Sequence, residues 1–425
     1  MQEDARTVPN ASPTDEAASS PSLGLLLLFV VYMLNYLDRQ ILSILKEPIA
    51  ADLHLSDTQL GLLGGFAFAM FYTVLAIPAA RLADRFSRVW VITAGFALWS
   101  GFTALCGMAG TYLVLLLARM GVGVGEACGV APSYSLVTDY FPPRSQARAL
   151  AIYSLGAPIG SAAGVLLGGL MAKVMDWRFA FVAIGVIGLL LAPILRLLAR
   201  DPPRQVAARQ LGLAAVARLA ASKPTFWLLA VGAGCSSLVL TGLFYWLPTF
   251  LARSLHMDIL SRSELLAAVL LIAGVIGMSG GGWLADRLAT RDRRIYALIP
   301  ASAFFMSAPL FALAIFARTP LEVFTLLLLP LMLSQSVFGP ALTAVLHLSP
   351  ASSRSTMSAL FLLLGNLIGI GIGPYFFGKV SDLLKPQFGA DSIKYAFLYG
   401  LGIYWLAALL MYCASRSIAR DWVEH

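Results

Sequence analysis

Twelve long apolar stretches, separated by mostly short polar connections, occupy most of the chain. A helix that crosses the hydrocarbon core of a bilayer needs about 20 predominantly apolar residues, and these stretches have that length. Of the 425 residues, 59% are apolar and 12% are charged, whereas soluble domains contain roughly 45–50% and 25%. This composition excludes a soluble enzyme, a secreted disulfide scaffold and a disordered protein. Because the stretches do not alternate in polarity, it also excludes an outer-membrane barrel.

The sequence therefore predicts an all-α membrane protein with twelve transmembrane helices in two six-helix bundles. The predicted spans are 22–45, 57–80, 89–109, 111–138, 148–172, 178–198, 225–251, 264–284, 295–317, 321–346, 356–378 and 394–415. The predicted organisation is a disordered cytoplasmic tail over 1–21, an N-terminal bundle over 22–198, a polar linker over 199–223, a C-terminal bundle over 224–416 and a cytoplasmic tail over 417–425.

The distribution of Lys and Arg predicts the orientation of the chain. The even-numbered connections and the two termini carry 19 of these residues, and the odd-numbered connections carry 9. Because cytoplasmic loops are enriched in positive charge, both termini and the linker are predicted to be cytoplasmic. Residues 1–21 lack the basic start of a signal peptide. The first apolar stretch is therefore predicted to remain as a span of the inner (cytoplasmic) membrane.

The remaining composition narrows the partners that we expect. The net charge of +8 does not indicate nucleic-acid binding, because the basic residues separate apolar stretches and do not gather in a soluble domain. The four cysteines lie in apolar stretches without metal-ligand spacing and are interpreted as packing residues. No Ser/His or metal-spaced cluster supports an enzyme. We expect a monomer without metal or cofactor.

The two halves of the chain share an internal repeat. Ala80-Arg81-Leu82-Ala83-Asp84-Arg85 closes the second span, and Gly282-Trp283-Leu284-Ala285-Asp286-Arg287 closes the eighth, 202 residues later. A second echo pairs Arg144-Ser145 with Arg354-Ser355 at an offset of 210 residues. Two echoes at nearly the same offset indicate a duplicated six-span unit.

The first repeat motif resembles the signature of the major facilitator superfamily of secondary transporters. The family pattern is a small residue, any residue, Leu, a small residue, Asp and Arg, followed by another basic residue. Here it reads Ala80 to Arg85 with Arg88 after it, although Ala80 and Ser87 stand where the family usually has glycine. Within the superfamily the chain resembles the Spinster-like lipid and organic-solute transporters. That resemblance rests on Asn35-Tyr36-Leu37-Asp38-Arg39 in the first span and on Arg119 and Gly125-Glu126 in the fourth.

The resemblance implies the major facilitator fold, in which two pseudo-symmetric bundles rock about a central site in alternating access. It also implies a proton-coupled carrier of lysophospholipids, sphingolipids or related amphiphiles. Protons, an amphiphile and membrane lipids would then be its partners, and a proton gradient would take the place of a cofactor.

Four charged residues lie inside predicted spans and away from their ends, where a charge costs at least about 2.5–3.5 kcal/mol. Asp38 lies roughly 24 Å along the first span at 1.5 Å per residue, and its neighbour Arg39 points about 100° away. Arg119 and Glu126 are two turns apart and share one face of the fourth span. We therefore expect all four to converge in the N-terminal bundle. Glycines 121, 123 and 125 would let other groups approach the helix of Glu126 closely.

The functional interpretation is that Glu126 or Asp38 takes up a proton, with Arg39, Arg119, Asn35 and Tyr36 as charge or substrate partners. Burial disfavours a charged carboxylate and a nearby arginine favours it. A conformational change that moves the arginine would thereby couple protonation to opening. The alternative is two permanent ion pairs that only fix helix packing.

The repeat motifs predict a cytoplasmic gate. Asp84 would meet basic groups at the starts of neighbouring helices and latch the cytoplasmic side while the carrier faces outward. The alternative is that these charges are solvated and contribute little. The predicted gate residues are Asp84, Arg85, Arg88, Asp139, Arg148, Asp286 and Arg287.

The C-terminal spans contain almost no charge near mid-membrane. A charged half that faces an apolar half suits an amphiphile, whose polar head would lie near the first and fourth spans. The alternative is that the polar and aromatic side chains are ordinary core or lipid-facing residues. The candidate cavity residues are Thr241, Tyr245, Trp246, Gln335 and Asn366.

The predicted function is a proton-coupled secondary active transporter of a lipid-like or organic amphiphile. One alternative is a proton-coupled transporter of small organic anions or drugs, with Arg39 or Arg119 holding a carboxylate. A second alternative, from another class, is a lipid scramblase. The Ala157-Pro158 pair in the fifth span does not decide between symport and antiport.

Overall fold

The computed structural model describes residues 21–202, 218–289, 292–350 and 353–423, and these ranges contain helices and no strand. Residues 1–20 of the predicted N-terminal tail, most of the predicted linker and the last two residues lie outside the described residues, and Pro21 already belongs to the first helix. The all-α prediction is confirmed. The last helix continues beyond residue 416 to Asp421, so the predicted C-terminal tail begins later than expected.

Six membrane crossings form the N-terminal half. Three of them are interrupted, the second at Gly65, the fourth between Glu126 and Val130, and the fifth at Leu155. The helices of this half are α1 (Pro21–Leu53), α2 (Asp57–Gly64), α3 (Phe66–Arg85), α4 (Arg88–Gly107), α5 (Tyr112–Glu126), α6 (Val130–Tyr140), α7 (Pro143–Ser154), α8 (Gly156–Val174) and α9 (Trp177–Leu198).

The C-terminal half repeats this plan. Its last candidate membrane segment, Thr356–Asp421, is 66 residues long and holds two crossings, so eleven candidate segments correspond to twelve crossings. The helices are α11 (Pro224–Arg253), α12 (Ile259–Ala289), α13 (Ile295–Ile315), α14 (Pro320–Gln335), α15 (Phe338–His347), α16 (Arg354–Asn366), the π-helical η3 (Leu367–Ile372), α17 (Gly373–Phe388), the one-turn η4 (Gly389–Asp391) and α18 (Ser392–Asp421).

Local side-chain caps fix where some crossings begin. Ser56 accepts a hydrogen bond from the backbone N–H of Gln59 at 3.2 Å, and the Gln59 side chain accepts one from the Ser56 N–H at 2.9 Å. Thr319 and Glu322 form the same reciprocal box at the start of α14. Such boxes satisfy N–H groups that a helix start leaves without partners, so these two crossings begin at positions set by the local sequence.

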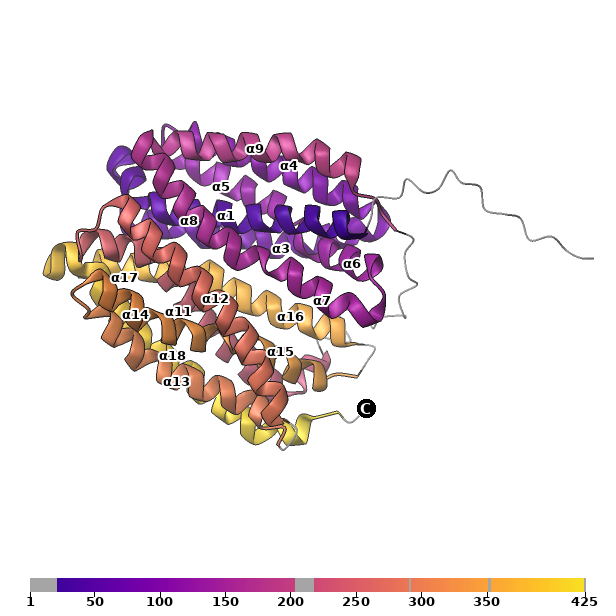
Figure 1. The fold of residues 1–425 in the computed structure, drawn as a ribbon. Coiled ribbons are helices and arrows are strands. Elements are labelled where there is room, and N and C mark those ends of the chain that lie inside the picture. Colours follow the sequence, from indigo (N-terminus) through magenta and orange to yellow (C-terminus); the bar gives the residue numbers. More distant parts are fainter. Residues whose placement is uncertain (1–20, 203–217, 290–291, 351–352, 424–425) are drawn as a thin grey trace, which may run out of the picture.

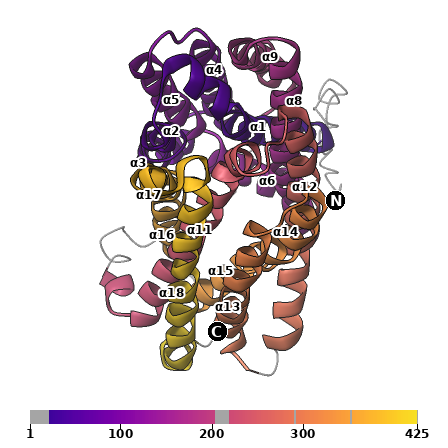
Figure 2. The same ribbon diagram turned by 90° about the vertical axis from the view of Figure 1, so that its left-hand side faces the viewer.

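The two halves lie side by side with their helices running roughly in one direction (Figure 1). We call the end where α1 begins, α9 ends and α11 begins the linker end, and the opposite end the distal end. Figure 2 views the molecule from the distal end and shows the halves as two groups of helices, the N-terminal one in indigo to magenta and the C-terminal one in rose through orange to yellow.

Close backbone contacts join the halves toward the distal end. A Cβ on Gly61 of α2 would lie 2.5 Å from the Pro374 carbonyl oxygen of α17, and one on Gly378 would lie 2.3 Å from the Asp57 carbonyl oxygen. A side chain at either glycine would force the two helices apart. The Thr58 backbone N–H also donates to Oδ2 of Asp382 at 2.7 Å. The structure is therefore a conformation in which the distal end is closed.

Candidate functional site

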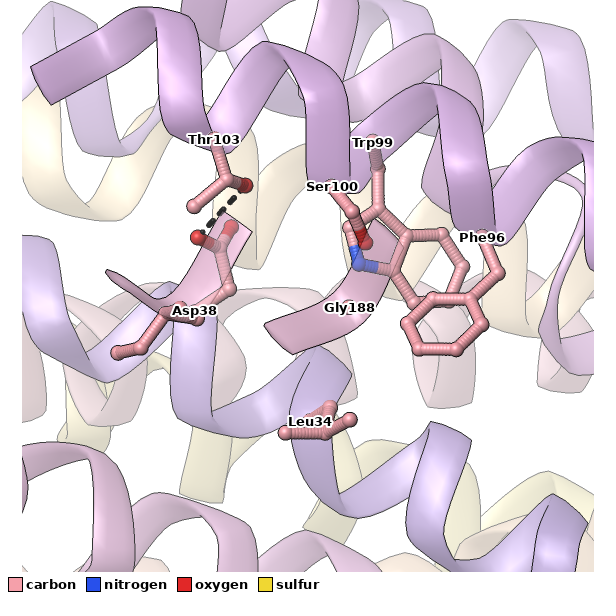
Figure 3. A pocket seen from close by; sticks show the side chains of 8 residues that line it. Leu34, Asp38, Phe96, Trp99, Ser100, Thr103 and Gly188 are labelled. Atoms are coloured by element: carbon pink, nitrogen blue, oxygen red, sulfur yellow. Dashed lines mark hydrogen bonds between the residues drawn. The ribbon is translucent and has the colours of Figure 1, made fainter. Parts of the chain in front are cut away.

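Helix α1 carries Asp38 and Arg39 into the N-terminal half, where they meet different partners. Asp38 Oδ2 lies 3.0 Å from Nη1 of Arg119 on α5, and Asp38 Oδ1 accepts a hydrogen bond from the Thr103 hydroxyl of α4 at 2.9 Å. Figure 3 shows the carboxylate of Asp38 pointing toward Thr103. Both oxygens of Asp38 have partners, and the side chain is 2% exposed. This pair lies wholly inside the half.

A small cavity lies beside Asp38. Its volume is about 10 Å³, which is about the space that one water molecule requires. The hydroxyl-bearing residues Ser100 and Thr103 line it together with the carboxylate, and Gly188 of α9 closes one side. The full lining is Leu34, Asp38, Phe96, Trp99, Ser100, Thr103, Ile184 and Gly188 (Figure 3). This space is too small for a cargo molecule, so Asp38 does not line an open substrate chamber here.

Arg39 forms the second ion pair, with Glu126 at the end of α5. Arg39 Nε donates to Glu126 Oε2 at 2.8 Å, and Arg39 Nη2 lies 2.7 Å from the same oxygen. The Arg39 side chain is 16% exposed, whereas that of Glu126 is fully buried. Within the described part of the chain, Glu126 Oε1 has no hydrogen-bond partner. Such a buried acceptor costs free energy while it stays unsatisfied.

Aromatic rings surround the Arg39 guanidinium. Its Cζ atom lies 4.6 Å from the ring centroid of Tyr72, 4.9 Å from that of Phe68 and 5.3 Å from that of Tyr36. The Phe68 ring also lies 5.5 Å from Cζ of Arg119. Cation–π contacts of this kind strengthen when water is excluded, so the rings help hold both guanidinium groups in an apolar setting.

Glycines allow α5 to bring Arg119 and Glu126 into this position. A Cβ on Gly123 would lie 2.7 Å from the Phe68 carbonyl oxygen, and one on Gly125 would lie 2.5 Å from the Trp99 backbone nitrogen. The alternating glycines therefore let α5 contact the backbones of α3 and α4 directly. This contact places the Glu126 carboxylate within reach of α1.

Asn35 and Tyr36 precede the charged pair on α1. Asn35 is 2% exposed, and its Oδ1 atom is buried without a hydrogen-bond partner among the residues that the structure describes. It lines a second small cavity with Tyr32, Trp99, Ser133 and other residues. Tyr36 is half-buried beside Arg39 and lies 3.5 Å, oxygen to oxygen, from the Tyr32 hydroxyl. Both predicted partners thus lie near the charged residues.

The predicted gate residues lie at the linker end. Arg88 forms an ion pair with Asp139 and a second one with Asp201, with 2.8 Å between Nε and Oδ1. Asp201 belongs to the start of the linker and was not among the predicted gate residues. The side chains of Asp84, Arg85, Arg148 and Arg287 are exposed. The side chain of Asp286 lies outside the described residues.

The C-terminal cavity candidates occupy several helices. The Thr241 hydroxyl lies 2.7 Å from the carbonyl oxygens of both Ser237 and Gly369. Gln335 and Asn366 are half-buried residues at the ends of α14 and α16. Tyr245 and Trp246 are buried near the distal end. In this conformation these last two belong to the contact between the halves.

A charged cluster that was not predicted from the sequence joins the halves at the distal end. Arg253, the last residue of α11, donates through Nη1 and Nη2 to the two carboxylate oxygens of Asp57, each at 2.8 Å. Glu47 adds a contact to Arg253 at 3.2 Å, and the Ser381 hydroxyl donates to Asp57 at 2.7 Å. In the sequence, Arg253 counts only as a loop charge that sets orientation. Its position at a span end gives no sign of a partner in the other half.

Lys46 belongs to the same region and is fully buried. Its ammonium group donates to the backbone carbonyl of Tyr245 in the other half. The nitrogen lies 4.0 Å from the ring centroid of Tyr245 and 4.1 Å from that of Trp246. In the sequence, Lys46 also counts only as a loop charge.

Comparison with known proteins gives consistent matches over nearly the whole chain. Residues 28–374 match the family model described as Major Facilitator Superfamily. An "MFS-type efflux pump" of Mycolicibacterium smegmatis is 33% identical over 93% of this chain and 93% of its own length. "Protein spinster homolog 1" of Mus musculus is 28% identical over 86% of this chain and 74% of its own length. The "Hexuronate transporter" of Bacillus subtilis is 26% identical over 91% of this chain and 93% of its own length.

A solved structure matches equally broadly. It is the crystal structure of a bacterial homologue to the human lysosomal transporter Spinster, in an inward-facing and unoccupied conformation. The TM-score is 0.86 at 28% sequence identity, with 95% of this chain and 98% of that chain covered.

Proposed function

Since the chain belongs to the Major Facilitator Superfamily and is a Spinster-like transporter, we propose that it moves an amphiphilic, lipid-like or organic solute across the membrane in exchange for, or together with, protons. The chain is a multi-pass membrane transporter and not an enzyme. Alternating access would occur by rocking of the two halves about the interface between them.

The observation that carries the proton-coupling proposal is the buried Arg39–Glu126 pair. Glu126 is fully buried and keeps one oxygen without a partner among the described residues, while Arg39 is partly exposed. The guanidinium is what favours the charged form of the carboxylate in this setting. If cargo or a conformational change draws Arg39 away, the carboxylate is left buried without a counter-charge and takes up a proton.

The Asp38–Arg119 pair has a different role in this proposal. Both Asp38 oxygens already have partners, and both side chains are only 2% exposed. Removing one member of such a pair leaves an uncompensated buried charge. We therefore place the exchanged proton on Glu126 and assign to Asp38 the task of holding Arg119 and the α1–α4–α5 packing.

The cargo proposal is an amphiphile of the lysophospholipid or sphingolipid class. Charged residues lie in the N-terminal half, whereas the C-terminal spans have almost no charge near mid-membrane. A polar head would contact the Arg39–Glu126 region and an apolar tail would contact the other half. The resemblance to the Spinster-like lipid and organic-solute transporters, which rests on Asn35 to Arg39 and on Arg119 and Glu126, implies this class of cargo.

A small organic anion is the second candidate cargo. Arg39 is the partly exposed member of its pair, and a guanidinium binds carboxylates well. The similarity to a hexuronate transporter favours this candidate.

We also propose that the linker end faces the cytoplasm, as the Lys and Arg distribution predicts. The closed distal end would then make this conformation inward-facing. The similarity to an inward-facing structure supports this orientation.

Transport into proteoliposomes tests the proposal. Uptake of a radiolabelled lysophospholipid and of a hydrophilic sugar acid is measured with and without an imposed pH gradient. We expect the gradient to drive lysophospholipid accumulation, with little accumulation of the acid. The reverse preference would establish the anion candidate. Transbilayer lipid movement at the same rate without a gradient would refute proton coupling and indicate a scramblase.

A further inference from the structure

The Tyr245 and Trp246 side chains of α11 form an aromatic cage. Their ring centroids are 5.5 Å apart and the ring planes meet at 86°, so the rings make two adjoining walls. The backbone carbonyl of Tyr245 supplies a hydrogen-bond acceptor at the base. Two aromatic faces and an acceptor are the elements that proteins use to hold organic ammonium groups.

Hydrogen bonds fix the orientation of both rings. The Tyr245 hydroxyl donates to the Leu60 carbonyl at 2.7 Å, and Trp246 Nε1 donates to the Pro374 carbonyl at 2.8 Å. The Tyr245 ring also requires glycine at position 64, because a Cβ there would lie 2.1 Å from the ring. The Trp246 bond lies within the C-terminal half, so that wall of the cage keeps its support when the halves separate.

Lys46 of the N-terminal half occupies this cage. Its nitrogen contacts both ring faces and the carbonyl. Among the described residues, no carboxylate lies within 4.0 Å of that nitrogen, because Glu47 and Asp57 are both engaged by Arg253. The Lys46 nitrogen is thus held by the two rings and the carbonyl and not by an ion pair.

We propose that this cage is a binding site for an organic ammonium group, which Lys46 fills while the distal end is closed. When the distal end opens, α1 moves away from α11 and the cage becomes available to the ammonium head of a cargo amphiphile. This step rests on the proposed function, and it specifies the cargo as an amphiphile with an amine or quaternary ammonium head. Lys46 and the cargo head cannot occupy the cage together. When the distal end closes, Lys46 therefore displaces the head from the cage toward the centre of the protein.

Ring faces carry negative electrostatic potential and the carbonyl is an acceptor, so the cage favours cations over anions. A head with both charges would have two complementary positions in the protein, an ammonium in the cage and an anionic group near Arg39. The sugar acids of the second cargo candidate have no ammonium group and would gain nothing from the cage.

Calorimetric titration of purified protein with n-propylammonium tests the site, because this ion matches the atoms that Lys46→Ala removes. We expect saturable binding to Lys46→Ala and binding about tenfold weaker or absent in Lys46→Ala/Trp246→Leu, since the desolvated ring contact is lost. The unmodified chain, with Lys46 in the cage, should bind more weakly than Lys46→Ala. The uncharged isostere 1-propanol should not bind with comparable affinity.

Equal binding of n-propylammonium to the single and double variants, or equal binding of 1-propanol, would overturn the proposal. If Lys46→Ala is not monodisperse, Lys46→Ser provides the same vacancy, and the same outcomes apply. The titration uses neither a pH gradient nor a cargo. The titration therefore tests the ammonium site even if gradient-driven transport fails. If the titration shows no binding, the proposal of proton coupling is not affected.

Discussion

Arg39 reaches from α1 to Glu126 on α5 with 2.8 Å between Nε and Oε2, and the carboxylate is fully buried while the arginine side chain is 16% exposed. An ion pair with one partly exposed partner and one sealed partner is suited to exchange. A ligand or a movement of α1 would displace the arginine, and the carboxylate would then lose its counter-charge.

Replacing Glu126 by Gln should remove coupling to the pH gradient. The amide keeps the shape of the side chain but cannot gain or lose a proton, so we expect gradient-driven uptake to fall about tenfold or more, with cargo binding retained. Uptake in proteoliposomes and binding by calorimetry measure the two effects. Glu264→Gln, on an exposed position of α12, is the matched control. Undiminished gradient-driven uptake by Glu126→Gln would argue against the coupling role.

Replacing Asp38 by Asn should mainly destabilise the protein. Arg119 would be left as a buried unpaired charge, and loss of one partner of such a pair costs roughly 3–5 kcal/mol. Thr103→Val removes one hydrogen bond to the Asp38 carboxylate, and a hydrogen bond to a charged group contributes about 1.5–3 kcal/mol. Thermal unfolding in detergent should therefore show a larger decrease in Tm for the first variant than for the second. If the Asp38→Asn protein is stable but has lost gradient-driven uptake, Asp38 and not Glu126 would be assigned as the residue that exchanges the proton.

Replacing Arg253 by Ala should open the distal end. Asp57 would lose both hydrogen bonds that join it to α11, and this loss removes a contact between the halves. A cysteine at Ser43, whose hydroxyl contacts the Tyr245 carbonyl across the interface at 3.1 Å, reports opening. In a background without the four native cysteines, we expect maleimide labelling at this position to rise about tenfold or more. Arg420→Ala, an exposed arginine at the linker end, should leave labelling unchanged.

Replacing Asp84 by Asn should favour the distal-closed conformation if the repeat motif latches the linker end in the alternate state. The same Ser43→Cys reporter would then label more slowly than in the parent protein. Arg88→Gln should not act in the same direction, because the ion pairs to Asp139 and Asp201 that it removes are present in the distal-closed conformation. Labelling that is unaffected by Asp84→Asn would exclude a latch at this end.

The sequence predicted the twelve crossings because each apolar stretch must satisfy its own backbone within a helix. It also predicted that Asp38, Arg39, Arg119 and Glu126 would meet, because charges in hydrocarbon need partners. Which acid meets which arginine depends on how α1 is rotated relative to α5. Spacing along one helix gives no information on that rotation.

The distal cluster was not predicted because its members are close only after the halves pack. Lys46, Asp57 and Arg253 lie at span ends, where charge is normal, and their partners are about half a chain away in sequence. The same holds for Asp201, whose pairing with Arg88 depends on the path of the linker start. Tyr245 and Trp246 were selected from the sequence as polar aromatics, but their contact with Lys46 is a product of tertiary structure.

Phe68 touches both guanidinium groups, with 4.9 Å from its centroid to Cζ of Arg39 and 5.5 Å to that of Arg119. One benzyl group is therefore a shared neighbour of two ion pairs that have no residue in common. A rotation of this ring would change the surroundings of both guanidinium groups at once, although only the Arg39–Glu126 pair is proposed to exchange a proton. Phe68 is thus an apolar contact that the two charge pairs of the N-terminal half share.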